Sequence, residues 1–184
     1  MPDQKISEPA RNIEIKARCR DIDRARRTAE SLPATLNAEG EQADLYFHSP
    51  QGRLKLRSTT FDDDSQFIWY SRPDVPDARV SEVRISRIRK PDKLRELCTA
   101  HFGTIGEVRK HRTILLYDSV RIHLDTVDGL GTFIEFEAPV DGQEERARRQ
   151  VQELMQQFEI QPDDLVSESY SQMLFGEEAK KKQQ

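Results

Sequence analysis

The segment Asn12-Ile13-Glu14-Ile15-Lys16-Ala17-Arg18 alternates strictly between polar and apolar side chains. Successive side chains of a strand point to opposite faces, so this pattern predicts a half-buried β-strand. The apolar face carries two isoleucines and an alanine. The polar face carries an acid two residues before a base, and charged faces of the same kind recur in at least three later strands. The fold therefore depends on where these charged faces point.

The length and composition indicate one globular domain. The chain has 184 residues, which is long enough to bury a substantial core, and 34% of them are charged while 35% are hydrophobic. We expect residues 1–176 to form a single domain. Residues 177–184 are rich in Lys, Gln and Glu, and we expect them to form a disordered charged tail.

The charge balance and the cysteine content argue against several functional classes. A net charge of −4 gives no overall basic field, so we expect no nucleic-acid partner. The N-terminus has no apolar signal-like region and no apolar run approaches the length of a membrane span, so we expect no membrane partner. Cys19 and Cys98 lie far apart in no metal-type spacing. This argues against a disulfide framework and favours the reducing cytoplasm as the location.

The remaining sequence predicts about eight strands and four helices. Helices are expected after the first and fifth strands, from Asp21 and from Lys90, and two more at the C-terminal end, from Asp141 and from Pro162. Eight antiparallel strands at this spacing predict a barrel or two packed sheets. The expected strands lie at 12–18, 41–48, 53–57, 66–72, 79–89, 106–117, 119–127 and 132–140.

The polar faces of these strands carry a dense set of charges. We assign the faces from the alternation alone, and this places Glu82 and Arg84 on the charged face of the fifth strand. The carboxylates in the set are Glu14, Glu82, Asp125, Glu135 and Glu137. The cations are Lys16, Arg18, Arg53, Lys55, Arg57, Arg72, Arg84, Lys110 and Arg112.

Two interpretations of these charges are open. For any one strand, alternating charge is more often a solvated face with cross-strand ion pairs. Five densely charged strands together favour faces that point into one barrel lumen, where the cations would outnumber the acids. An isolated buried charge costs too much to be left unpaired, so such a lumen needs water and a highly charged ligand. A triphosphate with Mg²⁺ or Mn²⁺ meets both needs, because Arg and Lys bind phosphate oxygens and carboxylates bind the metal.

The order of these motifs over nearly the whole chain resembles the CYTH domain, the family of triphosphate tunnel metalloenzymes. Asn12-Ile13-Glu14-Ile15-Lys16 is similar to its Glu-x-Glu-x-Lys signature, with Asn in place of the first Glu. The segments that resemble the class IV adenylyl cyclase branch most are His123-Leu124-Asp125, Gly129-Leu130-Gly131, Glu135-x-Glu137 and Ser169–Leu174. The resemblance implies an eight-stranded antiparallel barrel of the α+β class with helices packed outside.

The resemblance also implies roles for individual residues. Glu14 and Lys16 are the expected catalytic residues, with Lys16 orienting the nucleophile or the phosphate, or simply pairing with Glu14 or Glu135. Asp125 is either a further metal ligand or the partner of a lumen arginine. His123 is expected to face the lumen without binding the metal, and Tyr170 is expected to be a packing residue. The expected metal ligands are Glu14, Glu135, Glu137 and Asp125, and the expected substrate-binding cations are Lys55, Arg57, Arg72, Arg84, Lys110 and Arg112.

The implied activity is a metal-dependent reaction at phosphorus, with Mg²⁺ or Mn²⁺ as the cofactor. The substrate is ATP or tripolyphosphate, and the first hypothesis is a class IV adenylyl cyclase that forms cyclic AMP and pyrophosphate. The alternatives are a triphosphatase acting on tripolyphosphate, thiamine triphosphate or a nucleoside triphosphate, or a module that binds a phosphorylated ligand without turnover. Asn12 motivates the last alternative, because an amide lacks the charge of a carboxylate. The cyclase branch commonly dimerises, so a homodimer is also expected.

Overall fold

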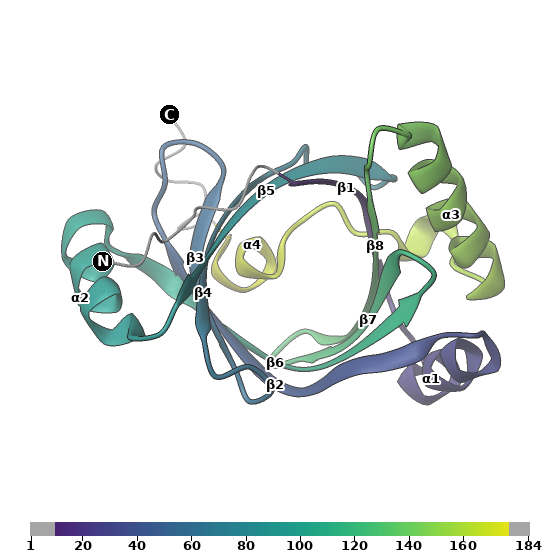
Figure 1. Ribbon diagram of the computed structural model, residues 1–184, viewed down its shortest axis with the longest axis horizontal. Helices are drawn as coiled ribbons and strands as arrows, with labels where there is room; N and C mark the ends of the chain where they lie inside the picture. The colour runs from purple at the N-terminus through teal and green to yellow at the C-terminus, as the bar shows by residue number, and fades with distance from the viewer. Residues whose placement is uncertain (1–9, 177–184) are drawn as a thin grey trace.

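The barrel expected from the sequence is present as a closed ring of eight antiparallel strands (Figure 1). The structure, a computed structural model, describes residues 10–176, so the expected tail at 177–184 lies outside the described residues. The order around the ring is β1-β5-β4-β3-β2-β6-β7-β8. The strands are β1 (Ala10–Arg18), β2 (Thr35–Phe47), β3 (Arg53–Thr59), β4 (Ser65–Ser71), β5 (Arg79–Ile88), β6 (Thr104–Tyr117), β7 (Val120–Val127) and β8 (Gly131–Pro139).

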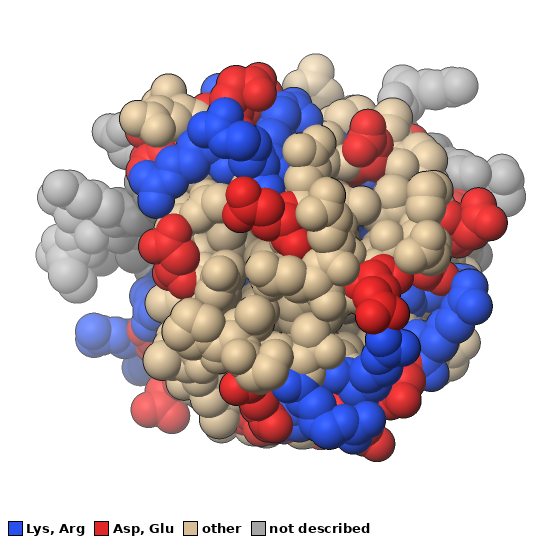
Figure 2. Space-filling model, turned by 90° about the vertical axis from the view of Figure 1, so that its right-hand side faces the viewer, with Lys and Arg blue, Asp and Glu red and all other residues tan. Residues whose placement is uncertain are grey.

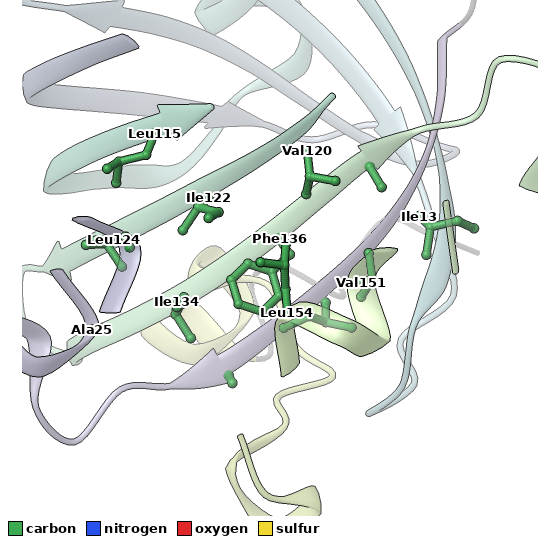
Figure 3. Packing of buried hydrophobic residues seen from close by; sticks show 14 of the residues in the cluster. Ile13, Ala25, Leu115, Val120, Ile122, Leu124, Ile134, Phe136, Val151 and Leu154 are labelled. Atoms are coloured by element: carbon green, nitrogen blue, oxygen red, sulfur yellow. The ribbon is translucent and has the colours of Figure 1, made fainter. Parts of the chain in front are cut away.

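The main hydrophobic core lies outside the ring, between one part of the barrel wall and two helices. Helices α1 (Ile22–Ser31) and α3 (Glu144–Gln157) cover the outer faces of β1, β7 and β8 (Figures 1 and 3). Ile13, Ile15 and Phe136 point into this core and are at most 1% exposed. The apolar face of β1 is therefore buried under helices, and its polar face must point into the ring.

The helix ends explain one confirmed prediction and one error. The side chain of Asp21 accepts a hydrogen bond from the Arg24 backbone N–H at 2.8 Å and caps α1, as predicted. Helix α3 begins after Gln143 instead of after Asp141, and no side chain caps it. Gly142 has φ of +90°, so the chain turns there before the helix can start.

Helix α2 (Pro91–Phe102) covers a second, smaller part of the outer wall. Its Cys98 and Leu94 pack against Phe47 of β2 and Leu56 of β3. Cys98 is buried and Cys19 is partly exposed, and both are free thiols. The outer faces of β2 and β3 therefore also face a helix, which leaves their charged faces pointing inward.

The fourth helix differs from the expectation that the helices pack outside. A single helix from Pro162 through Leu174 was predicted, but the chain forms a short 3₁₀ turn (Pro162–Asp164) and then helix α4 (Tyr170–Phe175). Figure 1 shows α4 inside the ring. Its apolar side chains pack against Val108, Val127 and Phe133 in a second hydrophobic cluster. A Cβ at Gly106 would lie 2.4 Å from the Phe175 ring, so only glycine admits this packing.

The surface over α1 and α3 carries charges of both signs. Figure 2 shows Lys and Arg interspersed with Asp and Glu around a central area of uncharged residues. The exposed pair Arg24–Glu159 and the partly exposed pair Arg148–Glu144 account for part of this mixture. Among the described residues, no helix is both long and apolar enough to cross a membrane.

Candidate functional site in the barrel lumen

The lumen contains a cavity of about 490 Å³ whose lining is rich in charged side chains. Asn12, Glu14 and Lys16 line it from β1, which confirms the predicted direction of that strand's polar face. The cations outnumber the carboxylates, so the cavity favours an anionic ligand. Its cations are Lys16, Lys55, Arg57, Arg72, Lys110, Arg112 and Arg121, and its carboxylates are Glu14, Asp44, Glu135 and Glu137.

A buried ion cluster holds Lys110 and Arg112 of β6 in place. Arg112 binds Asp125 of β7 through two donors, at 2.6 and 2.5 Å, and Lys110 Nζ lies 2.9 Å from the same carboxylate. Burial disfavours the charged form of Asp125, but the charges of Arg112 and Lys110 outweigh it and lower the pKa of the carboxyl. Of the two roles considered for Asp125, the structure shows the partner of a lumen arginine.

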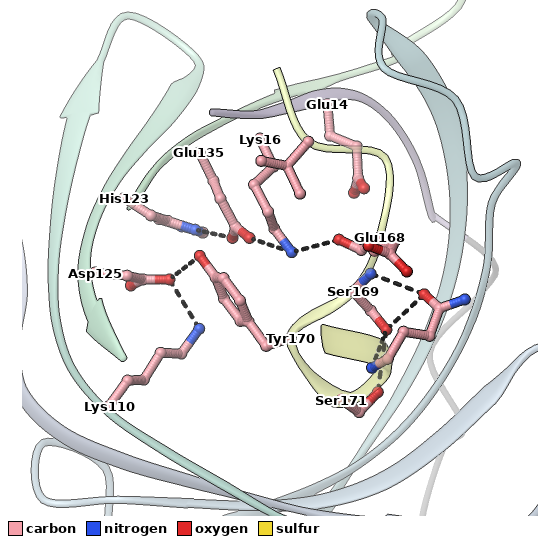
Figure 4. Close-up of polar contacts among 12 residues, drawn as sticks. Glu14, Lys16, Lys110, His123, Asp125, Glu135, Glu168, Ser169, Tyr170 and Ser171 are labelled. Atoms are coloured by element: carbon pink, nitrogen blue, oxygen red, sulfur yellow. Dashed lines mark hydrogen bonds and ion pairs between the residues drawn. The ribbon is translucent and has the colours of Figure 1, made fainter. Parts of the chain in front are cut away.

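Tyr170 of α4 completes this cluster from inside the barrel (Figure 4). Its hydroxyl donates to Asp125 at 2.9 Å, and its ring lies 3.7 Å from Lys16 Nζ and 4.7 Å from Lys110 Nζ. The sequence indicated only a packing residue, because nothing along the chain connects position 170 with position 125. Tyr170 therefore joins α4 to the charged residues of the lumen.

A second group in the lumen has the composition of a metal site. One ligand atom from each of His123, Glu135 and Glu137 lies within 4.8 Å of the others. His123 Nδ1 lies 3.6 Å from Glu135, beyond hydrogen-bonding distance, and both buried ring nitrogens have no hydrogen-bond partner among the described residues. Burial lowers the pKa of the imidazole and so favours the neutral form that binds metals. The two carboxylates are ligands that suit Mn²⁺ or Mg²⁺, and the imidazole is a candidate third ligand. The sequence analysis did not count His123 among the metal ligands.

Glu14, an expected metal ligand, has other partners in this structure. Arg72 Nε and Arg79 Nε lie 3.0 and 3.5 Å from its carboxylate. Arg79, the first residue of β5, is only 3% exposed and was missed because it stands alone before the alternating part of that strand. A metal role for Glu14 therefore stays a prediction, while its place in the lumen is shown.

Lys16 lies between the candidate metal group and α4. Its Nζ is 3.3 Å from Glu135 Oε1 and donates to the Glu168 carbonyl at 3.3 Å. Burial outweighs the attraction of Glu135 and lowers the pKa of this ammonium to about 8. The structure shows the pairing with Glu135, one of the interpretations considered for Lys16.

Asp44 of β2 is a second buried acid that the sequence analysis missed. Its carboxylate accepts from Lys55 Nζ at 2.8 Å and from Arg57 Nε and Nη2 at 2.7 and 3.0 Å. Burial, together with the neighbouring Arg57, lowers the pKa of Lys55 to about 7. Asp44 alternates with Leu45 in the sequence, so parity alone could have placed it on the same face as the β3 cations.

The predicted lumen position of Arg84 is wrong. Arg84 points outward from β5, where its guanidinium lies 5.8 Å from the Trp69 ring and 3.9 Å from Glu82. Val83 and Ile85 of the same strand line the cavity instead. Alternation defines two faces but not which one encloses the lumen. At Glu82 and Arg84 the outer face of β5 is solvent-exposed, so it does not require apolar residues there.

Comparison with known proteins gives a consistent result. The family model described as CYTH domain matches residues 10–170. A Methanocaldococcus jannaschii protein named "putative adenylate cyclase" is 22% identical over 88% of this chain and 97% of its own length.

Solved structures share the fold at low sequence identity. A Pyrococcus horikoshii protein superposes with a TM-score of 0.78 at 23% identity, over 88% of this chain and 98% of its own. A Hippeastrum protein superposes with a TM-score of 0.59 at 18% identity, over 89% of this chain and 93% of its own, and is described as having a dominant triphosphatase activity. At these identities the superpositions show the fold alone.

Proposed function

The chain belongs to the CYTH domain family, whose enzymes act on triphosphates, and we propose that it is a divalent-metal-dependent enzyme acting on a triphosphate-containing substrate. The observation that carries the proposal is that one lumen holds both an excess of cations and the His123–Glu135–Glu137 group. The excess of cations matches the negative charge of a triphosphate. The His123–Glu135–Glu137 group can bind the divalent ion that accompanies a triphosphate.

The cations that would bind the phosphates are already held in place by buried acids. Asp44 orients Lys55 and Arg57, and Asp125 orients Lys110 and Arg112. Such pre-organised donors stabilise phosphoryl charge without a further cost of ordering flexible side chains. Arg72 is the remaining substrate-binding cation proposed, and Arg84 is excluded because it faces outward.

Glu135, Glu137 and His123 would hold the divalent ion, with Glu14 as a further candidate ligand. When bound, the ion would withdraw charge from the phosphoryl oxygens. Lys16 lies beside Glu135, and so it is placed to orient a phosphate or the attacking group next to this site.

The proposed reaction is the cyclisation of ATP. The ribose 3′-hydroxyl releases its proton to water and its oxygen forms a bond to the α-phosphorus. The bond from that phosphorus to the bridging oxygen of the β-phosphate breaks, and pyrophosphate leaves. The names of the M. jannaschii protein and of a Vibrio parahaemolyticus protein that superposes with a TM-score of 0.77 support this choice. The cytoplasmic location and the homodimer stay predictions.

Triphosphate hydrolysis is the second candidate, supported by the triphosphatase activity described for the Hippeastrum protein. The same cations and acids would serve, with water attacking phosphorus in place of the ribose hydroxyl. Binding of a phosphorylated ligand without turnover is the third candidate. It is motivated by Asn12, which lines the lumen at the position where the family signature has Glu.

A substrate panel tests the proposal. The purified chain is incubated with Mg²⁺ or Mn²⁺ and with ATP, tripolyphosphate or thiamine triphosphate, and cyclic AMP, pyrophosphate and phosphate are measured. We expect Glu135→Gln to lower activity by about 10²-fold or more, as for other losses of transition-state stabilisation. Glu82→Gln, at an outward-facing carboxylate on β5, serves as the matched control. Absence of any product from all three substrates at several pH values would overturn the enzymatic proposal.

A further inference from the structure

One part of the lumen wall is apolar, in contrast to the rest. We call it the apolar wall and define it by Ala10 of β1, Ile68 of β4, and Val83 and Ile85 of β5, all of which line the cavity. Ile68 and Ile85 are direct cross-strand partners, and Val83 is the partner of Ala10. Side chains in such register contact one another on the same face of a sheet, so the wall is one continuous surface.

On β5 the charged side chains face outward and the apolar side chains face the lumen, which is the reverse of β1 and β3. Its charged residues Glu82 and Arg84 face solvent, while Val83 and Ile85 face a cavity that is highly charged elsewhere. An inorganic polyphosphate would gain nothing from an apolar surface, because each of its oxygens needs a donor or a cation. Ligand pockets that combine an apolar surface with a few placed polar groups bind organic molecules.

The apolar wall adjoins the phosphate-binding cations. Ile68 is the cross-strand partner of Lys55, and Gln66, two residues earlier on β4, is the partner of Arg57. Gln66 also lines the cavity, and its side-chain amide forms no hydrogen bond with the rest of residues 10–176. An amide offers both a donor and an acceptor, which is what the edge of a nitrogen heterocycle requires.

The size of the cavity agrees with a ligand larger than its phosphates. At about 490 Å³ it falls within the range of roughly 300–1,000 Å³ that is typical of pockets for organic ligands. A triphosphate chain lying on the cations of β3 and β6 would leave the apolar wall for the group attached to the α-phosphate.

We propose that the apolar wall and Gln66 bind a planar heterocycle, such as a nucleobase, carried on the α-phosphate, and so select an organic triphosphate over tripolyphosphate. This rests on the proposed function, because it assumes that the lumen binds a triphosphate.

The test compares two ligands on one pair of variants. The Kd of ATP and the Kd of tripolyphosphate are measured by calorimetry on the full chain without divalent metal, so that no turnover occurs. Ile85→Thr keeps the β-branched shape but places a hydroxyl in the apolar wall. Ile88→Thr makes the same change three residues along β5, at a position that does not line the cavity.

We expect Ile85→Thr to weaken ATP binding about tenfold, the discrimination that a methylene-sized change gives in an apolar pocket. Tripolyphosphate binding should change by less than about twofold, and Ile88→Thr should affect neither ligand. An equal effect of Ile85→Thr on both ligands, or none on either, overturns the inference while leaving the proposed function in place. If the wild-type chain binds neither ligand and also forms no product in the metal-containing substrate panel, the proposed function fails, and this inference fails with it.

Discussion

The charged part of the lumen wall and the apolar wall both consist of alternating strands, but they present opposite kinds of side chain to the lumen. On β2, β3, β6 and β7, each buried cation cluster is held by an acid, Asp44 in one case and Asp125 in the other. The apolar wall, on β1, β4 and β5, needs no such partners. The comparison shows that each buried acid of the lumen binds two cations, which leaves an excess of positive charge. It also shows that one side of the lumen is charged and another is apolar, which suits a ligand with one charged and one apolar end.

The largest expected effect concerns the buried pairs. We expect Arg112→Met to lower the free energy of unfolding by about 3–5 kcal/mol, because it leaves Asp125 buried without its main partner. Urea denaturation measures this change. Arg84→Met is the matched control, and we expect it to change stability by less than about 0.5 kcal/mol because Arg84 faces outward. Similar effects at the two positions would contradict the distinction between inner and outer charges.

The next prediction tests whether α4 belongs to the charged wall. Tyr170→Phe removes the hydroxyl that donates to Asp125, and hydrogen bonds to charged groups contribute about 1.5–3 kcal/mol. We expect a loss of about 2 kcal/mol in urea denaturation. Tyr117→Phe, on β6 outside the cavity, is the control. An unchanged stability for Tyr170→Phe would mean that α4 is held by its apolar contacts alone.

A third prediction concerns the candidate metal group. We expect His123→Asn to weaken Mn²⁺ binding by about tenfold or more, since perturbed metal-binding shells typically cost 10–100-fold in affinity. Electron paramagnetic resonance of free Mn²⁺ measures it independently of activity. His111→Asn tests an exposed histidine on the outer face of β6 and should leave Mn²⁺ affinity unchanged. Equal Mn²⁺ affinity in wild type and His123→Asn would remove His123 from the ligand set.

The smallest expected effect is a pH dependence of ligand binding. Lys55 has a pKa of about 7 in the free protein, and a bound polyphosphate would raise it, so binding takes up a proton between the two values. Affinity for tripolyphosphate should therefore fall as pH rises from 7 to 9, by at most about tenfold per pH unit. Calorimetry at several pH values measures this fall.

The control for this pH dependence is Lys55→Arg. Arginine stays charged over the whole range, so this variant should bind with a flatter profile than wild type. The ligand's own titration affects both proteins equally. Identical profiles would show that Lys55 does not titrate in this range.

Much of the site could be predicted because a charged residue every second position is a local signal. Glu14, Lys16, Lys55, Arg57, Lys110 and Arg112 were all placed in the lumen from their alternation with apolar residues, and the structure puts each there. Alternation failed as a guide where either face of a strand could point into the lumen. On β5 both faces were plausible, and Arg84 was placed on the wrong one.

By itself, the sequence determined the number and order of the strands, the charged faces of β1, β3 and β6, and membership of the family. It did not place every strand end, because β2 begins at Thr35, well before the predicted residue 41. Only the tertiary structure decided which face of β5 encloses the lumen, which acid holds which cation, and that α4 lies inside the ring. The reason is physical: a period of two fixes the two faces of a strand, but the closing of the ring decides which face is inside. Contacts such as Tyr170–Asp125 join residues 45 positions apart, and no local pattern encodes them.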